Sequence, residues 1–158
     1  MKDTLDQRLR AALADATNAE RFATALALVQ QELGAVMGTL HRLGDDHHLH
    51  LVAASPGIPA PVLEASRRIP LGKGIAGEAA ATGKPVTLCN LQTDTSGVAR
   101  PGAKATGLGG SLCVPTFDGD RVVGAVGIGW MGERAINDEE TAALLAAGRA
   151  IAPALSGR

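Results

Sequence analysis

The histidines are the first candidates for chemistry, because all of them lie in one short segment. The four are His41, His47, His48 and His50. Imidazole nitrogens bind Zn²⁺ and Ni²⁺, and the carboxylates of Asp45 and Asp46 lie beside them. If Leu43 pairs with His48 across a hairpin turn, three imidazoles share one face of a sheet. These are His41, His48 and His50. A one-residue shift of that register separates them, so we expect a solvated polar hairpin and assign no metal ligand.

The two cysteines, Cys89 and Cys113, are the candidate nucleophiles. Cys113 lies in an apolar segment that we expect to be a buried strand, where cysteine behaves as a small hydrophobic residue. Neither thiol lies beside a base that would activate it. Two cysteines also make a poor disulfide framework, which favours a reduced, cytoplasmic protein. We therefore assign no catalytic residue.

The segment Gly72–Gly77 reads GKGIAG and has the glycine spacing of a dinucleotide-binding loop. Such a site needs a buried strand before it, whereas the preceding residues, VLEASRRIPL, are charged and helical in pattern. The glycines are better explained as a turn leading into a helix that begins at Gly74 or Ile75. Free N–H groups at that helix start, beside Lys73, could receive an anionic part of a ligand. A solvated loop lysine is the simpler alternative.

Residues 90–109 have no apolar periodicity and contain five Gly or Pro residues, so we expect a long loop. A loop of this length in a compact domain is usually functional, and binding groups usually lie on loops that a rigid scaffold positions. We therefore predict that polar side chains of this loop, together with the lysine before the short helix, form the rim of a ligand site. The predicted rim residues are Lys73, Thr95, Ser96, Lys104 and Thr106.

The elements that position these residues follow from the apolar pattern. Helices are predicted over 4–16, from the Asn18 cap to Gly34, over 60–68, over 75–82 and from the Asn137 capping box onward, with strands over 35–43, 48–54, 85–89, 110–117 and 121–130. The turns at 44–47 and 118–120 are hairpin signals, which require antiparallel pairing. The order of elements predicts an α+β fold and not a doubly wound parallel sheet.

Composition excludes several classes of partner. The chain has 158 residues, which predicts one domain, and 46% of them are hydrophobic. The net charge is −1 and aromatic residues make up 2% of the chain, which argues against a nucleic-acid-binding protein. No apolar run is long enough to cross a membrane, and the N-terminus lacks the apolar core of a secretion signal. We expect a cytoplasmic protein without nucleic-acid or membrane partners.

Three stretches, in this order, resemble motifs of the GAF domain family. They are GKGIAGEAAATGKPV, SLCVPTFDGDRVVGAVGIG and INDEETAALLAAGRAIAPAL. The resemblance implies a central antiparallel sheet of roughly five or six strands, with terminal helices on one face. It places the short helix and the long loop on the other face, around a ligand pocket. Residues 18–158 would form the GAF domain, and residues 1–17 a preceding amphipathic helix.

The resemblance implies a non-catalytic sensory or regulatory domain that binds a small molecule and signals to another protein. It leaves the ligand or cofactor unidentified, because family members bind cyclic nucleotides, bilins, haem, other metabolites or no known ligand. The Gly- and Ala-rich strand around Val123–Gly127 leaves room for a ligand. A dimerisation or scaffold module with a filled pocket is the alternative.

Some relatives reduce free methionine sulfoxide with a cysteine in the GKGIAG stretch and with other cysteines in the long loop. Ala76 stands at the first position here and 90–109 contain no cysteine, so that activity is less favoured.

Two stripes of large apolar side chains lie on the terminal helices. The first comprises Leu5, Leu9 and Leu13, and the second Leu144, Ile151 and Leu155. An isolated helix of the length of 4–16 is marginal in water, so its stripe must be buried against something. Pairing of the terminal helices in a homodimer would bury both stripes, and we expect such a dimer. The alternative is that 4–16 fold back onto their own sheet.

Overall fold

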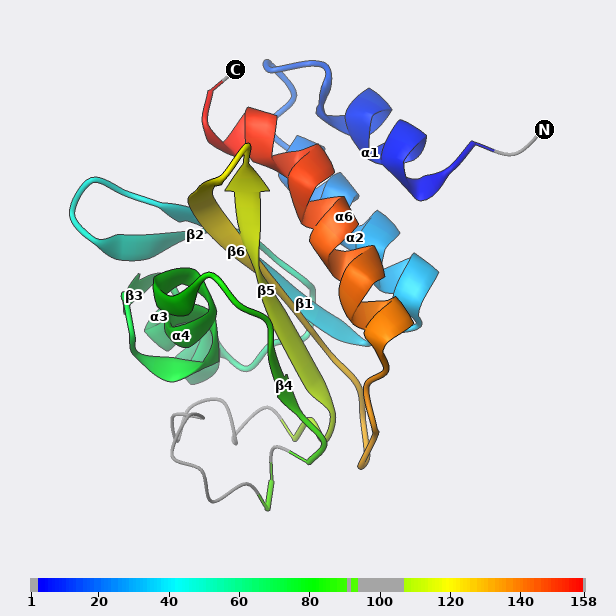
Figure 1. Ribbon diagram of the computed structural model, residues 1–158, viewed down its shortest axis with the longest axis vertical. Helices are drawn as coiled ribbons and strands as arrows, with labels where there is room; N and C mark the ends of the chain where they lie inside the picture. Colours follow the sequence, from blue (N-terminus) through cyan, green and yellow to red (C-terminus); the bar gives the residue numbers. More distant parts are fainter. Residues whose placement is uncertain (1–2, 91, 94–106, 158) are drawn as a thin grey trace.

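The computed structural model describes residues 3–90, 92–93 and 107–157. Figure 1 shows a sheet with helices on both faces. The strands are β1 (Met37–Leu43), β2 (His48–Ala54), β3 (Arg68–Pro70), β4 (Val86–Leu88), β5 (Ser111–Asp118) and β6 (Arg121–Gly129). The helices are α1 (Leu5–Leu13), α2 (Arg21–Leu33), α3 (Ala60–Ser66), α4 (Gly74–Thr82) and α6 (Asp138–Leu155). No helix within these ranges combines the length and the apolar composition needed to cross a membrane.

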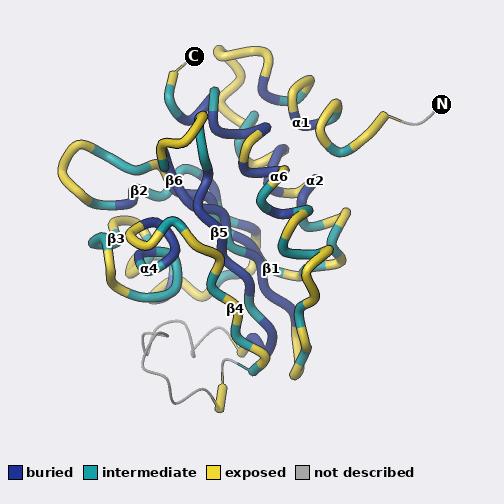
Figure 2. The backbone as a smooth tube through the Cα atoms, in the orientation of Figure 1, coloured by how far each residue is buried: buried dark blue, intermediate teal, exposed yellow. Residues whose placement is uncertain are grey.

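The sheet is antiparallel, with six strands in the order β3-β2-β1-β6-β5-β4. Helices α1, α2 and α6 lie on one face, which we call the helix-layer face. Helices α3 and α4 lie on the other, which we call the α4 face. Figure 2 shows the central strands buried between these layers. The predicted α+β class, antiparallel pairing and terminal helices on one face are confirmed.

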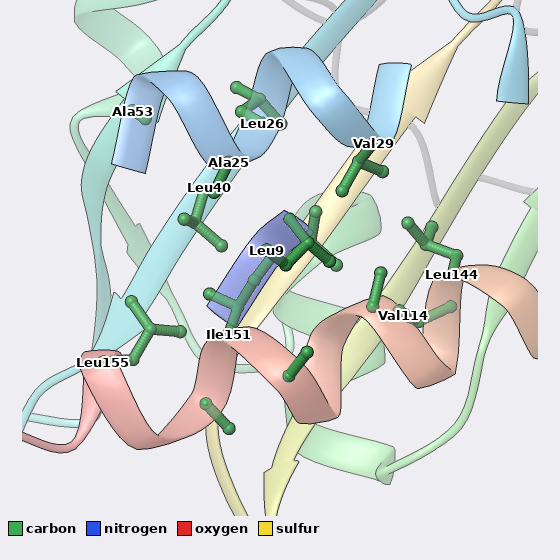
Figure 3. Close-up of a cluster of buried hydrophobic side chains, with 14 of the residues drawn as sticks. Leu9, Ala25, Leu26, Val29, Leu40, Ala53, Val114, Leu144, Ile151 and Leu155 are labelled. Atoms are coloured by element: carbon green, nitrogen blue, oxygen red, sulfur yellow. The ribbon is translucent and has the colours of Figure 1, made fainter. Parts of the chain in front are cut away.

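The helix-layer face holds the larger of two hydrophobic clusters. Figure 3 shows Leu9 of α1, Val29 of α2 and Ile151 of α6 pointing into it, and each of these side chains is completely buried. Trp130 is also buried, and its Nε1–H donates to the Leu33 carbonyl oxygen at 3.1 Å. This bond joins the end of β6 to the end of α2, so the long helices and the sheet form one unit.

Local signals set most helix ends. Asn137 and Glu140 form the predicted capping box of α6, with Glu140 N–H donating to Asn137 Oδ1 at 2.8 Å. Gly34 and Gly83 end α2 and α4 in the left-handed conformation, as predicted for C-terminal glycines. Asn18 does not cap α2, which begins at Arg21; its Oδ1 instead accepts the Glu20 N–H at 3.0 Å in the preceding turn.

Two predicted boundaries are wrong for physical reasons. Helix α1 ends at Leu13 and not at 16, because Asp15 Oδ1 accepts the Thr17 N–H at 2.9 Å and forms a turn. The predicted helix over 60–68 ends at Ser66, and Arg68–Pro70 form the edge strand β3, paired with β2. A strand of three residues is too short to have a detectable apolar period.

The leucines of α1 are buried within their own chain. Leu9 is 0% and Leu13 6% exposed, and α1 contacts both α2 and α6. The stripe for which we expected a partner subunit is therefore covered by this chain, mainly by α2 and α6 and not by the sheet that the alternative named. The α1 stripe gives no support to a dimer, and the homodimer stays a prediction.

We predict that Leu9→Ala destabilises the chain by about 2–5 kcal/mol, because it leaves a cavity among α1, α2 and α6. Arg10→Ala on the same helix removes only an exposed ion pair with Asp6 and should cost about 0.5 kcal/mol or less. Urea unfolding followed by circular dichroism measures both variants. Equal stability of the two variants would show that α1 is not docked on this core.

Candidate functional site

The candidate site lies on the α4 face of the three central strands. Thr39 of β1 pairs with Gly127 of β6, which pairs with Cys113 of β5. Cys113 and Ala125, which precedes Gly127 by two residues on β6, pack in the cluster beneath α4, together with Ala79 and Ala80 of that helix. We call Thr39, Cys113 and Gly127 the Gly127 floor. None of the three carries a charged side chain.

Gly127 leaves room for a side-chain atom in this floor. A Cβ placed there would lie 3.5 Å from Cys113 Sγ and 3.6 Å from Thr39 Oγ1, which are ordinary van der Waals distances. The three atoms nearest to that Cβ belong to Cys113 and Thr39. Gly127 is half-buried, whereas Val126 and Ile128 beside it are buried on the helix-layer face. A ligand atom in the place of that Cβ would therefore contact both the Thr39 hydroxyl and the Cys113 thiol.

Helix α4 packs over Cys113 and extends to the hairpin end of the same face. Just before it, the Leu71 N–H donates to the His47 carbonyl oxygen at 3.1 Å, in the turn between β1 and β2. At its other end, a Cβ on Gly83 would lie 3.9 Å from Phe117 Cζ, close to the turn between β5 and β6. Both contacts are at the hairpin end of the sheet. Gly77 is required for this approach, because a Cβ there would lie 2.6 Å from the Pro70 carbonyl oxygen.

The described residues that flank the predicted long loop lie at the other end of the sheet. Leu88, at the end of β4, pairs with Ser111 at the start of β5. The Gly109 N–H donates to the Trp130 carbonyl oxygen, and the Arg134 N–H to that of Cys89, each at 2.9 Å. The Gly127 floor therefore extends from beneath α4 toward this end of the sheet.

The predicted rim residues are only partly described. Lys73 is the exposed N-cap of α4, and its N–H donates to the Pro70 carbonyl oxygen at 3.1 Å, at the hairpin end. Thr95, Ser96, Lys104 and Thr106 lie outside the described residues. The rim therefore stays a prediction. The Gly-rich strand predicted space for a ligand. A glycine inside a strand does not show which face its space opens to, so neither Thr39 nor Gly127 was singled out from the sequence.

The register that could have assembled a metal site is wrong. Leu43 pairs with Leu49 and not with His48, so the turn is one residue longer than predicted and Leu51 lies opposite His41. His50 pairs with Arg42, whose Nε–H donates to the Leu155 carbonyl oxygen of α6, so His50 is on the helix-layer side. His41 follows Thr39 by two residues and lies on the α4 face. Within the described ranges, no three His, Cys, Asp or Glu side chains are placed to hold a metal ion.

Asp46 is the centre of an exposed polar cluster in this hairpin. His50 Nε2 lies 2.9 Å from Asp46 Oδ2, and Arg68 donates to the same oxygen at 3.2 Å. The hydrogen bond with His50 is the main reason why the pKa of Asp46 lies below its usual range. This exposed cluster ties the turn between β1 and β2 to the edge strand β3.

The two thiols have different environments. Cys113 is 3% exposed, and burial raises the pKa of its thiol to about 12. It is therefore neutral at physiological pH and a poor nucleophile. Cys89 is exposed and follows β4. The arrangement gives the floor a buried neutral sulfur atom for packing and leaves the exposed thiol outside it.

The comparisons with known proteins agree with this architecture. Residues 15–156 match the family model described as GAF domain. This chain belongs to the GAF domain family. The match covers the whole sheet and all helices except α1. Comparison with curated proteins finds no match.

Several solved structures share the fold of this GAF domain. The GAF domain of the Acinetobacter phosphoenolpyruvate-protein phosphotransferase is 13% identical, with a TM-score of 0.78 over 97% of this chain and 91% of that one. The free methionine-R-sulfoxide reductase of Neisseria meningitidis, solved with its substrate, is 16% identical, with a TM-score of 0.75 over 99% and 92%. A GAF sensor protein of Burkholderia vietnamiensis is 21% identical, with a TM-score of 0.73 over 94% and 89%. At such identities the likeness shows the fold alone.

We predict that dithionitrobenzoate labels one thiol in the native GAF domain and two after unfolding in guanidinium. Cys89 is accessible, whereas Cys113 is buried and protonated. Absorbance of the released thionitrobenzoate measures both counts. Cys89→Ser should leave no rapid labelling, and rapid labelling of Cys113 in this variant would contradict the described packing.

Proposed function

We propose that this GAF domain is a non-catalytic sensory or regulatory module that binds a small molecule over the Gly127 floor. The observation that carries the proposal is the room for a side chain at Gly127, which is half-buried in a central strand although its neighbours Val126 and Ile128 are buried. A sheet that served only for packing would place a side chain there, because protein interiors are close-packed. The ligand occupies that position and transmits its presence to a partner protein.

The chemistry of the floor specifies how the ligand is held. The Thr39 hydroxyl both donates and accepts hydrogen bonds, and the Cys113 thiol and the Gly127 backbone offer an apolar contact surface. The part of the ligand that lies on the floor is therefore uncharged, with a polar atom toward Thr39. Charged parts of the ligand meet the predicted rim of Lys73, Thr95, Ser96, Lys104 and Thr106.

Reduction of free methionine sulfoxide is the enzymatic alternative, because the Neisseria meningitidis reductase shares this fold. Thiol-dependent reduction of a sulfoxide needs a thiolate that attacks sulfur and a second thiol that resolves the product. Cys113 is neutral and buried, which argues against the first step. A scaffold whose floor is covered by its own side chains is the non-binding alternative.

A homodimer remains part of the prediction for this domain. Among the described residues, the large hydrophobic side chains that are exposed are Val36 and Met131, and neither lies on α1 or α6. The described surface of the terminal helices therefore offers little apolar area to pair. Light scattering of the full chain at micromolar concentration decides between monomer and dimer.

We predict that native mass spectrometry of the chain purified from its own host shows a retained small molecule. Gly127→Leu should lower its occupancy about tenfold or more, because overpacking a fitted site costs about 1–3 kcal/mol. Thr87→Leu is the matched control: Thr87 is an exposed strand residue that pairs with Leu112 of the helix-layer face. Full occupancy in Gly127→Leu, or a wild-type chain without any bound molecule, contradicts the proposal.

We predict that the wild-type chain does not reduce free methionine-R-sulfoxide with dithiothreitol as the reductant. Methionine formation measured by liquid chromatography should equal that of the Cys89→Ser, Cys113→Ser double variant. Turnover by the wild type that the double variant lacks would establish the reductase alternative instead.

A further inference from the structure

His41 is a titratable side chain that the proposed ligand site does not use. It lies on the α4 face of β1 and is 1% exposed. Its Nε2 is 2.8 Å from the carbonyl oxygen of Ser66, the last residue of α3. A carbonyl oxygen only accepts hydrogen bonds, so Nε2 carries the proton and Nδ1 of the neutral ring is an acceptor.

The surroundings of His41 favour the neutral ring. Nδ1 is buried and has no hydrogen-bond partner. In the imidazolium form this atom would become a donor without an acceptor, and a positive charge would enter a buried layer. Burial lowers the pKa of His41, and the bond to Ser66 offsets part of that effect.

The charged groups around His41 do not stabilise its protonated form. Strand β6 has none from Val122 to Gly129. On β2, His50 repels a charge on His41 and lowers its pKa further. The nearby carboxylates are already paired, Glu64 of α3 with Arg67, and Asp46 with His50 and with Arg68 of β3.

Helix α3 has few other attachments. It has seven residues, no side-chain hydrogen bond at its N-cap and one buried residue, Val62. Beyond its C-terminus, the Leu51 N–H of β2 donates to the Arg67 carbonyl oxygen at 2.9 Å. The bond from His41 to Ser66 is therefore a large share of what holds the end of α3 to the sheet.

We propose that His41 is a pH-operated latch for residues 60–70, which comprise α3 and β3. The neutral imidazole holds the end of α3 against β1, and protonation breaks this docking. In the released state the ring has the ordinary histidine pKa of about 6.5. Because the docked state binds the proton less readily, docking is strongest above that pH and weakens as the pH falls through it.

Hydrogen exchange of the full chain at pH 7.5 and pH 5.5 tests the latch, with rates corrected for intrinsic exchange. Protection of residues 60–70 is expected to fall by up to about tenfold, because a released imidazole with a pKa of about 6.5 is about ten parts protonated to one at pH 5.5. Residues 138–155 of α6 are expected to keep their protection. An unchanged 60–70 segment, or an equal loss over the whole chain, would overturn the proposal.

Two variants assign the effect to His41. His41→Gln keeps an N–H donor for Ser66 but does not titrate, so the pH dependence of residues 60–70 should disappear. His50→Gln changes an exposed neighbour and should keep most of it. Nuclear magnetic resonance of the wild-type ring gives a second measurement that needs no variant. A His41 midpoint of 6.5 or higher while α3 stays protected, or a pH effect retained in His41→Gln, contradicts the latch.

Discussion

The central strands carry large side chains on one face and small ones on the other, and the rest of the structure depends on this difference. On the helix-layer face these strands place Leu40, Leu112 and Val126. On the α4 face, one register position away, they place Thr39, Cys113 and Gly127. The large side chains fill the space beneath α1, α2 and α6. The small ones let α4 lie close to the sheet over Cys113 and leave room for a side chain at Gly127.

This asymmetry separates stability from binding within one sheet. Leu9 belongs to the cluster of the helix layer and not to the cluster beneath α4. The α4 face gains less from apolar burial, because Leu49 is the one large aliphatic side chain among the five buried residues of its cluster, and the other larger aliphatic side chains packed there are only partly buried. Single contacts therefore matter more on this face. The backbone of α4 lies close to the Pro70 carbonyl oxygen at Gly77, and the end of α3 is bonded to His41 through the Ser66 carbonyl oxygen. A face held by a few such contacts can respond to a ligand or a proton without loss of the core.

The sequence predicted what depends on local signals and missed what depends on long-range pairing. The Asn137 capping box, the C-terminal glycines and the β5–β6 turn follow from neighbouring residues, and the three GAF motifs gave the fold. The turn between β1 and β2 is one residue longer than its residue types suggest, with His47 in the left-handed conformation, so the predicted register was wrong by one residue. The destination of the α1 leucines was ambiguous, because a stripe does not show whether its own chain or a partner covers it. Gly127 was visible as a strand glycine, but its place in a floor required the pairing of three strands.

The central claim is that the position above Gly127 holds a ligand. A crystal structure of the chain purified from its own host tests it most directly. We predict density for a non-protein molecule within about 4 Å of Gly127, with a polar atom in hydrogen-bond reach of the Thr39 hydroxyl. Side chains of the protein filling that position, with no bound molecule on the α4 face, would contradict the proposed ligand site and favour a scaffold module.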